Sequence, residues 1–406
     1  MIFLSASYDK QGLYYYMARA GGMILEEKWE EVLEQYDLKV KRISWARGAK
    51  LLETDHGFFQ LKQFIGKPRQ LALEHAVTSG LVKQGYQLVD HILETKDGML
   101  FAKGSIRKYG RKSNKQIIEE RGNSVREEIE GSNVVLEEKR EQSQSDKKEW
   151  WQLPFPDNCD IYVIRKWFPG EEGNFRNAEF LKRAAAALGK LHNAMEIVEV
   201  PEELAIFHPS MALLETWQKH NRELKRIRRY ILNKKQKNEF EILFLSMEGG
   251  YFDTARNACH LLEQGNCRQL FLEAAKQQKF CHGSYNYHNL LDSRMGLATV
   301  CFENAGIGVP VFDLYQMMRK LLEKNRWEKG LAIDVLREYE KQRRLDKRER
   351  ELLYIMLLYP EKFWKVSNHY YNSRKSWINK IDIVKLEELG RQQSKRQETL
   401  EYLRNY

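Results

Sequence analysis

The chain has 406 residues, of which 42% are hydrophobic, so it has enough material for two domains with buried cores and is not a disordered protein. Lysine and arginine number 67 against 57 acidic residues, and the net charge of +10 would attract acidic partners, although both signs are common enough for an ordinary charged surface. The five cysteines have neither metal-ligand spacing nor an even disulfide framework, which argues against a zinc site and favours free thiols in a reducing compartment.

The first residues are apolar, but Asp9 and Lys10 come too early for the core of a signal peptide. No later apolar run has the length of a membrane span. We therefore expect synthesis in the cytoplasm without a signal peptide, and no membrane span.

Mixed helical and strand patterns fill the first hundred residues. Apolar residues at helical spacing predict helices over 23–36 and 69–83, short β-rich runs predict strands over 40–45, 49–54 and 58–64, and a tight turn at 96–98 predicts a hairpin over 89–102. The turn between the first two strands contains a single glycine, Gly48. The glycine-rich loop that covers nucleotide phosphates in kinases is therefore not expected here.

Residues 105–148 differ in composition from the rest of the chain, because they are rich in Lys, Arg, Glu, Ser and Asn and poor in large apolar residues. Such a segment cannot bury enough surface to offset its chain entropy, so we expect a disordered or loosely helical insertion. A solvated, tolerated loop is favoured over a dedicated interaction tail.

Beyond the insertion, a strand over 161–167 runs into the Pro-Gly turn at 169–172, which predicts a hinge between two lobes. Helical patterns follow over 177–194, 211–232, 256–262, 267–279 and 384–406. His192, near the end of the first of these helices, is expected to pack or cap. The helix over 211–232 is basic around its apolar stripe and could hold an acidic partner, whereas nucleic acid is disfavoured because no aromatic platform or known nucleic-acid module accompanies it.

Two places carry residues arranged as in phosphoryl-transfer enzymes. Lys62, in the third predicted strand, is followed by Glu74 in the next helix, and a strand lysine paired with a helix glutamate positions phosphates in kinases. Residues 281–291 have the frame of a catalytic loop, in which an acid orients the substrate hydroxyl and a later asparagine helps to hold a metal ion. Here Ser284 stands at the position of the acid, and Asn289 follows it. A strand predicted over 298–304 comes next.

Further motifs are FQLK at 59–62, GEE at 170–172, LGKLH at 188–192, HGSYNYHN at 282–289, VCFE at 300–303, FDLY at 312–315, YPEKFWK at 359–365 and NHYYNS at 368–373. In their order and spacing the chain resembles the spore coat protein S (CotS-like) family, a branch of the aminoglycoside- and choline-kinase-like fold in endospore-forming bacteria. The resemblance covers nearly everything except the charged insertion.

The resemblance implies a role for each matching residue in the first half of a kinase site. Lys62 would be the phosphate-facing lysine and Glu74 its ion-pair partner. Ser284 takes the place of the catalytic aspartate, and Asn289 matches the asparagine on the metal side.

The remaining matches surround the metal position. Cys301 stands where these kinases have the aspartate that holds magnesium, and Glu303, two residues on, is shared with many relatives. Asp313 matches an aspartate that braces the catalytic loop.

The two lost aspartates decide the expected chemistry. Serine cannot act as a carboxylate base, and losing general-base help alone costs on the order of 10²- to 10⁴-fold in rate. Cysteine is a soft ligand, whereas magnesium requires hard oxygen ligands. We therefore expect a pseudokinase that needs no cofactor. The alternative is an active phosphotransferase that uses ATP and magnesium through Lys62, Asn289 and Glu303, with Asp292 or another displaced acid as base.

The expected fold is α+β and two-lobed, protein-kinase-like in the aminoglycoside phosphotransferase manner, with a small mixed lobe over 1–168 and a large, mainly helical lobe over 169–406. The expected function is that of a structural or binding component of the endospore coat, and the alternative is an aminoglycoside- or choline-kinase-type phosphotransferase. Other spore coat or morphogenetic proteins are the expected partners, and the spore coat the place of deposition.

Overall fold

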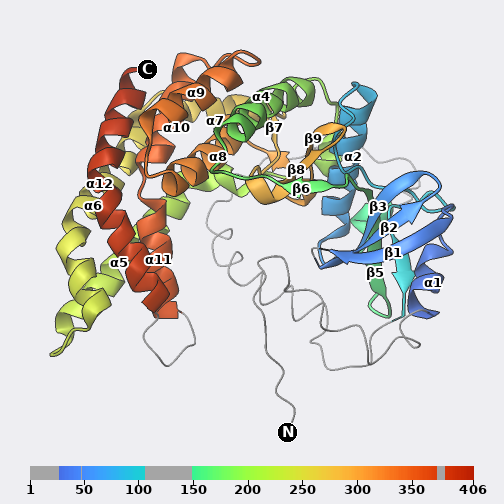
Figure 1. The fold of residues 1–406 in the computed structure, drawn as a ribbon, viewed down its shortest axis with the longest axis horizontal. Helices are drawn as coiled ribbons and strands as arrows, with labels where there is room; N and C mark the ends of the chain where they lie inside the picture. The colour runs from blue at the N-terminus through green and yellow to red at the C-terminus, as the bar shows by residue number, and fades with distance from the viewer. Residues whose placement is uncertain (1–26, 47, 106–148, 373–379) are drawn as a thin grey trace, which may run out of the picture. The chain divides into compact units, whose positions relative to one another are not determined.

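The computed structural model describes residues 27–46, 48–105, 149–372 and 380–406, which form two compact units (Figure 1). The first unit contains the described residues up to Leu71 and from Ile92 to Trp167. The second contains Ala72–His91 and the described residues from Phe168 to Tyr406. Apart from Ser105, the charged insertion expected over 105–148 lies outside the described residues.

The first unit is built on an antiparallel sheet of five strands in the order β1-β2-β3-β5-β4. The strands are β1 (Val40–Ala46), β2 (Ala49–Thr54), β3 (Gly57–Gln63), β4 (Ala102–Gly104) and β5 (Asp160–Lys166). The three predicted strands of the meander and the strand expected over 161–167 are therefore confirmed. Gly48 has φ +71°, a value that glycine adopts without strain, at the turn between β1 and β2.

Both faces of this sheet are covered. Helix α1 (Glu27–Leu33) packs Trp29 and Val32 against Tyr162 and Ile164 on one face. Ile161 and Val163 belong to a second apolar cluster, with Phe64, Leu71 and Phe101. Alternate residues of β5 therefore point to opposite sides, which explains its continuous apolar sequence. The helix expected over 23–36 ends at Leu33, and its first residues lie outside the described chain.

The hairpin expected over 89–102 is not formed. The tight turn exists, because the N–H of Gly98 donates to the carbonyl of Thr95 (2.9 Å), but the two arms do not form a paired ladder. Leu93 instead bonds to the carbonyl of Ile164 (2.9 Å), and β4 pairs with residues 160–162 of β5. The neighbouring strand β5 supplies the partners that a local hairpin would otherwise need. A short 3-10 helix, η1 (Trp150–Gln152), precedes β5.

The second unit is mainly helical. Helix α2 (Pro68–Lys83), predicted over 69–83, enters it at Ala72. Its further helices are α4 (Ala178–Met195), α5 (Leu213–Asn233), α6 (Glu239–Gln264), α7 (Cys267–Lys276), α8 (Val311–Lys324), α9 (Lys329–Glu340), α10 (Lys347–Leu358), α11 (Glu361–Asn372) and α12 (Lys380–Asn405). Short 3-10 helices are η2 (Glu202–Leu204), η3 (Pro209–Ala212), η4 (Tyr287–Asn289) and η5 (Phe302–Asn304). None of the helices in the described ranges is both long and apolar enough to cross a membrane.

Two small sheets lie within this helical unit. One has the order β6-β8-β9, with strands β6 (Gly170–Glu172), β8 (Leu290–Ser293) and β9 (Gly296–Thr299), and the other pairs β7 (Phe280–Cys281) with β10 (Gly306–Ile307). The turn expected at 169–172 is therefore partly a strand. Gly170 fits there because a Cβ at this position would lie 2.5 Å from the carbonyl oxygen of Asp292 on β8.

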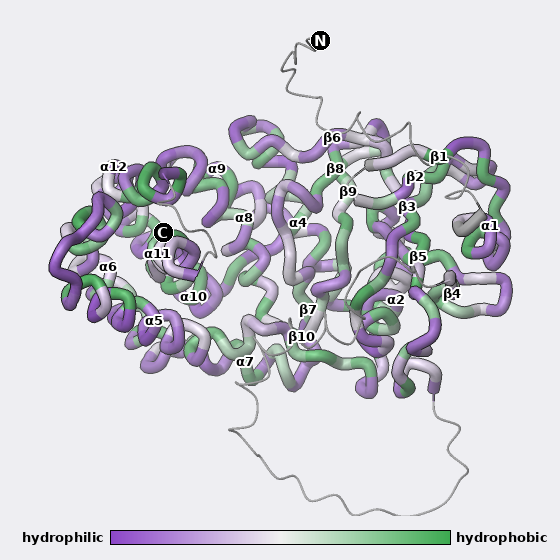
Figure 2. Tube along the Cα trace, turned by 90° about the horizontal axis from the view of Figure 1, so that it is seen from below, coloured by the Kyte–Doolittle hydropathy of each residue, from purple (hydrophilic) through white to green (hydrophobic). Residues whose placement is uncertain are grey.

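Helices α5, α6, α11 and α12 lie side by side and share one apolar core (Figure 1). Phe363 is central, because its ring stacks on Phe244 (5.2 Å between centroids) and on Tyr251 (4.4 Å). Green and purple alternate along α5 and α6 in the hydropathy-coloured trace, as expected for helices with one buried face (Figure 2).

Two predicted elements of the second unit have different limits. The helix expected over 256–262 is the end of the longer helix α6, which runs through Gly249 and Gly250. The strand expected over 298–304 ends at Thr299 because Cys301 turns into the left-handed region (φ +70°) and η5 follows.

Candidate functional site

The loop over 282–289 follows β7, and Asp313 holds its backbone in place. This residue lies in the first turn of α8, and its side chain is fully buried. One carboxylate oxygen accepts the backbone N–H of His282 (2.7 Å), and the other accepts the N–H of Gly283 (2.9 Å). The carboxylate therefore fixes the backbone of the loop at its first two residues.

Buried histidines surround this carboxylate. His192 of α4 lies with Nε2 3.3 Å from Asp313 and with Nδ1 2.7 Å from the hydroxyl of Tyr339. His282 donates from Nε2 to the carbonyl of Val300 (3.1 Å) and accepts the backbone N–H of Ser284 at Nδ1 (3.2 Å). Burial alone would raise the pKa of Asp313, but the hydrogen bond and charge of His192 and the N–H of His282 lower it overall. Burial lowers the pKa of both His192 and His282. His192 thus packs and braces.

Ser284 occupies the centre of the loop. Its hydroxyl oxygen accepts a hydrogen bond from the side-chain amide of Asn304 (2.9 Å), at the end of η5. Its carbonyl oxygen accepts from the amides of Asn286 and Asn289 (2.9 Å each). The loop is therefore closed on itself by neutral hydrogen bonds, and its central side chain is a hydroxyl that bonds to an amide.

Cys301 begins the segment that carries Asn304, because it is the residue directly before η5. Its backbone N–H donates to Asp90 (2.7 Å), a buried residue 211 positions earlier in the chain. This bond fixes the left-handed turn that places η5, which carries Glu303. Asp90 and Asn304 were beyond sequence reasoning, because no spacing motif marks them and both reach the site through tertiary contacts.

The residues predicted to surround a metal ion do not fit a magnesium site. The donors that the sequence offers are the amide oxygen of Asn289, the thiol of Cys301 and the carboxylate of Glu303, and magnesium prefers carboxylate and water oxygens. Within the described ranges, no cluster of three or more His, Cys, Asp or Glu side chains is arranged to hold a metal ion.

The other predicted site residues lie on separate elements. Lys62 is half-buried on β3 in the first unit, and Glu74 is buried on α2 in the second. Their predicted pairing spans the two units and stays a prediction. Asp292, the possible displaced base, lies on β8 and accepts two hydrogen bonds from Arg183, one of 3.0 Å, and these lower the pKa of its carboxyl.

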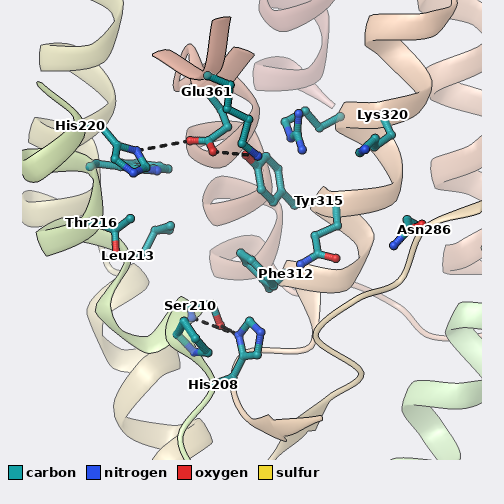
Figure 3. A pocket seen from close by; sticks show the side chains of 15 residues that line it. His208, Ser210, Leu213, Thr216, His220, Asn286, Phe312, Tyr315, Lys320 and Glu361 are labelled. Carbon is teal, nitrogen blue, oxygen red and sulfur yellow. Dashed lines mark hydrogen bonds and ion pairs between the residues drawn. The ribbon is translucent and has the colours of Figure 1, made fainter. Parts of the chain in front are cut away.

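A pocket of about 230 Å³ adjoins the loop. Side chains of α5 form one side and those of α8 the other, with Glu361 of α11 and His208 at opposite ends (Figure 3). Asn286 brings the loop to its rim, and Gln316, which also lines the pocket, donates to the carbonyl of Gly283 (2.9 Å). Gln316 thus connects the wall of the pocket to the backbone of the loop.

Comparison with solved structures defines the class of protein. An aminoglycoside phosphotransferase from Alicyclobacillus acidocaldarius is similar with a TM-score of 0.67 at 17% identity, over 92% of this chain and 94% of that one. A spectinomycin phosphotransferase in complex with ADP and spectinomycin is similar with a TM-score of 0.51 at 11% identity, over 88% and 92% of the two chains. The fold is therefore the aminoglycoside phosphotransferase-like fold, which confirms the predicted fold class, with a small antiparallel sheet and a larger helical part.

The sequence profile of the family described as "Spore coat putative kinase YutH" matches residues 172–403, which is more than half of the chain. The chain belongs to this family of kinase-like spore coat proteins, and the resemblance drawn from the motifs is confirmed. No curated protein gave a match.

Proposed function

We propose that this protein is a pseudokinase that acts as a structural or binding component of the endospore coat. The observation that carries the proposal is the state of the loop: Ser284 stands in the acid position with its hydroxyl bonded to Asn304, and the backbone around it is intact. The fold and the loop are preserved, whereas the two acids that the chemistry needs are replaced.

The two replacements affect the same reaction. A serine hydroxyl has no charge with which to orient a substrate hydroxyl, and the missing general base costs on the order of 10²- to 10⁴-fold in rate. Cys301 offers sulfur where magnesium needs oxygen, so the ion that neutralises the transferred phosphate has lost its main protein ligand. Either loss impairs phosphoryl transfer, and both act on the same step.

The catalytic prediction can be tested on the full chain with magnesium and ATP. We expect no phosphoryl transfer, and at most a small shift in melting temperature on adding Mg-ATP. The double variant Ser284→Asp/Cys301→Asp is the positive control, because Asp tolerates the left-handed backbone of position 301 and restores both carboxylates. It should bind Mg-ATP more tightly than the natural chain. Phosphoryl transfer by the natural chain that disappears in Lys62→Ala would overturn the pseudokinase assignment.

The coat role rests on the family and on the basic face of α5. Arg222, Lys225, Arg226 and Arg229 are exposed on this helix and could bind an acidic coat or morphogenetic protein. A fluorescent fusion followed through sporulation should collect on the forming spore. Fluorescence that stays in the mother-cell cytoplasm would contradict the role.

The pocket beside the loop favours a second candidate, an ATP-dependent small-molecule phosphotransferase with a non-standard site. In that case Lys62, Glu74 and Asn289 would bind ATP, and Asn289 with Glu303 would hold magnesium. The Mg-ATP experiment separates this candidate from the first.

A further inference from the structure

The pocket beside the loop contains more positive than negative charge. Arg319, Lys320 and Lys365 line it against one acid, Glu361. Lys365 pairs with Glu361 (3.1 Å), and Arg319 pairs with Glu323 (2.6 Å) on the same helix. Lys320 is half-buried and has neither a hydrogen bond nor an ion pair with any residue of the described ranges.

Two other nitrogen groups of the pocket wall already face acids. Nδ1 of His220 lies 3.7 Å from Glu361, and the guanidinium of Arg319 pairs with Glu323. The His220 ring is held in place by stacking on Trp364 (3.3 Å between centroids). Lys320 is therefore the cation of the pocket wall that lacks an ion-pair partner within the described ranges, and a half-buried charge of this kind favours a bound acceptor.

The rest of the wall is apolar or neutral. Aromatic rings come from Phe312, Tyr315 and Trp217, and an aliphatic side chain from Leu213. Figure 3 shows Phe312 and Tyr315 on the side of α8 that carries Lys320. A volume of about 230 Å³ is many times what one water needs, which suits a small organic molecule.

We propose that this pocket binds a small organic anion, in which a phosphate or carboxylate group lies against Lys320 and an apolar body lies against the aromatic wall. The proposal goes beyond the coat function and does not depend on whether phosphoryl transfer occurs. Burial and the nearby charge of Arg319 lower the pKa of Lys320, so an anion would relieve an unfavourable positive charge. A cationic ligand would add to it.

Titration calorimetry on the full chain tests the proposal with three probes that share a benzene ring: phenyl phosphate, 3-phenylpropanoate and 2-phenylethylamine. We expect at least one of the two anions to bind and the amine not to bind, and the tighter anion identifies the preferred group. Lys320→Met should weaken anion binding about 10-fold or more, because a charge-assisted contact is lost. Lys320→Arg should retain binding. Lys190→Met is the matched control, because Lys190 is an exposed lysine of α4 outside the pocket, and it should change nothing.

A measurement on the unaltered chain covers the case in which a variant fails to fold. Amine-reactive labelling followed by mass spectrometry should show Lys320 protected by the anion that binds, with Lys190 labelled equally in its presence and absence. Three results would each overturn the proposal. In the first, neither anion binds. In the second, the natural chain and Lys320→Met bind the anion with equal affinity, and in the third the chain binds the amine more tightly than either anion.

Discussion

Asp313 is the side chain on which the shape of the loop most depends. It is fully buried, and it accepts two backbone N–H groups from consecutive loop residues and contacts His192. A buried carboxylate of this kind is stable only while all its donors remain. Asp313 therefore holds the backbone of the loop in place whatever side chains stand at positions 284 and 301.

We expect Asp313→Asn to destabilise the chain by roughly 2–3 kcal/mol at pH 7, since an amide replaces one acceptor with an N–H that faces a backbone N–H. Urea unfolding of the two proteins measures the difference. The pKa of Asp313 is lowered from its ordinary value of 3.8, so its contribution is present above that pH and is lost as the pH falls further. The difference in free energy of unfolding between the natural chain and Asp313→Asn should therefore become smaller below about pH 3.8.

Asp334→Asn is the control, because Asp334 is exposed on α9 and pairs only at 3.5 Å with Lys182. It should change stability by less than about 0.5 kcal/mol. A loss as large as that of Asp313→Asn would mean that general charge effects, and not the brace, account for the result.

At the level of elements, the sequence predicts what local pattern determines and misses what tertiary contact determines. The strands of the meander follow from β-rich runs between turn residues, and β5 follows from its apolar sequence. The hairpin over 89–102 fails because β5 competes for its arms. Ser284 and Asn289 could be placed in one loop from motif spacing, and Asp313 beside it from the resemblance to the family. Asp90 and Asn304 could not be placed, because their bonds join distant segments.

In helix α6, tertiary contacts form a longer element than the local sequence pattern predicts. Gly249 and Gly250 interrupt its helical pattern, yet it continues because Phe240, Phe244 and Tyr251 are buried on one face. A Cβ on either glycine would meet nothing within 4 Å. The apolar face thus overrides the weak helix propensity of two exposed glycines.

Two glycine substitutions should consequently act in opposite directions. Gly250→Ala should stabilise the chain by about 0.5–1 kcal/mol, because alanine is the better helix former and the site is open. Gly283→Ala should destabilise it by about 1–2 kcal/mol or more, since position 283 has φ +77° and its Cβ would lie 2.2 Å from the carbonyl of Asn304. Thermal unfolding measures both. Equal effects would mean that backbone conformation at the loop does not limit stability.

At the scale of the whole molecule, each unit has its own core. Leu52 lies in the cluster beneath α1, and Leu224 lies in the cluster shared by α5, α6, α11 and α12, and both are fully buried. The family match over 172–403 falls within the second unit, which also contains the loop and the pocket. The part of the chain that the family profile matches therefore lies on one body with a core of its own.

Because each unit has a core of its own, we expect each to lose stability on its own. Leu52→Ala and Leu224→Ala remove the same atoms from two buried sites, and each should cost about 2–5 kcal/mol in its own unit. Hydrogen exchange followed by mass spectrometry reads the units separately. In Leu52→Ala the slow amides of β1, β2, β3 and β5 should exchange roughly 30-fold faster or more, while those of α6 and α11 keep their rates, and Leu224→Ala should give the converse. If both variants accelerated the slow amides of both units alike, the molecule would unfold as one cooperative body, and separate cores would not mean separate stabilities.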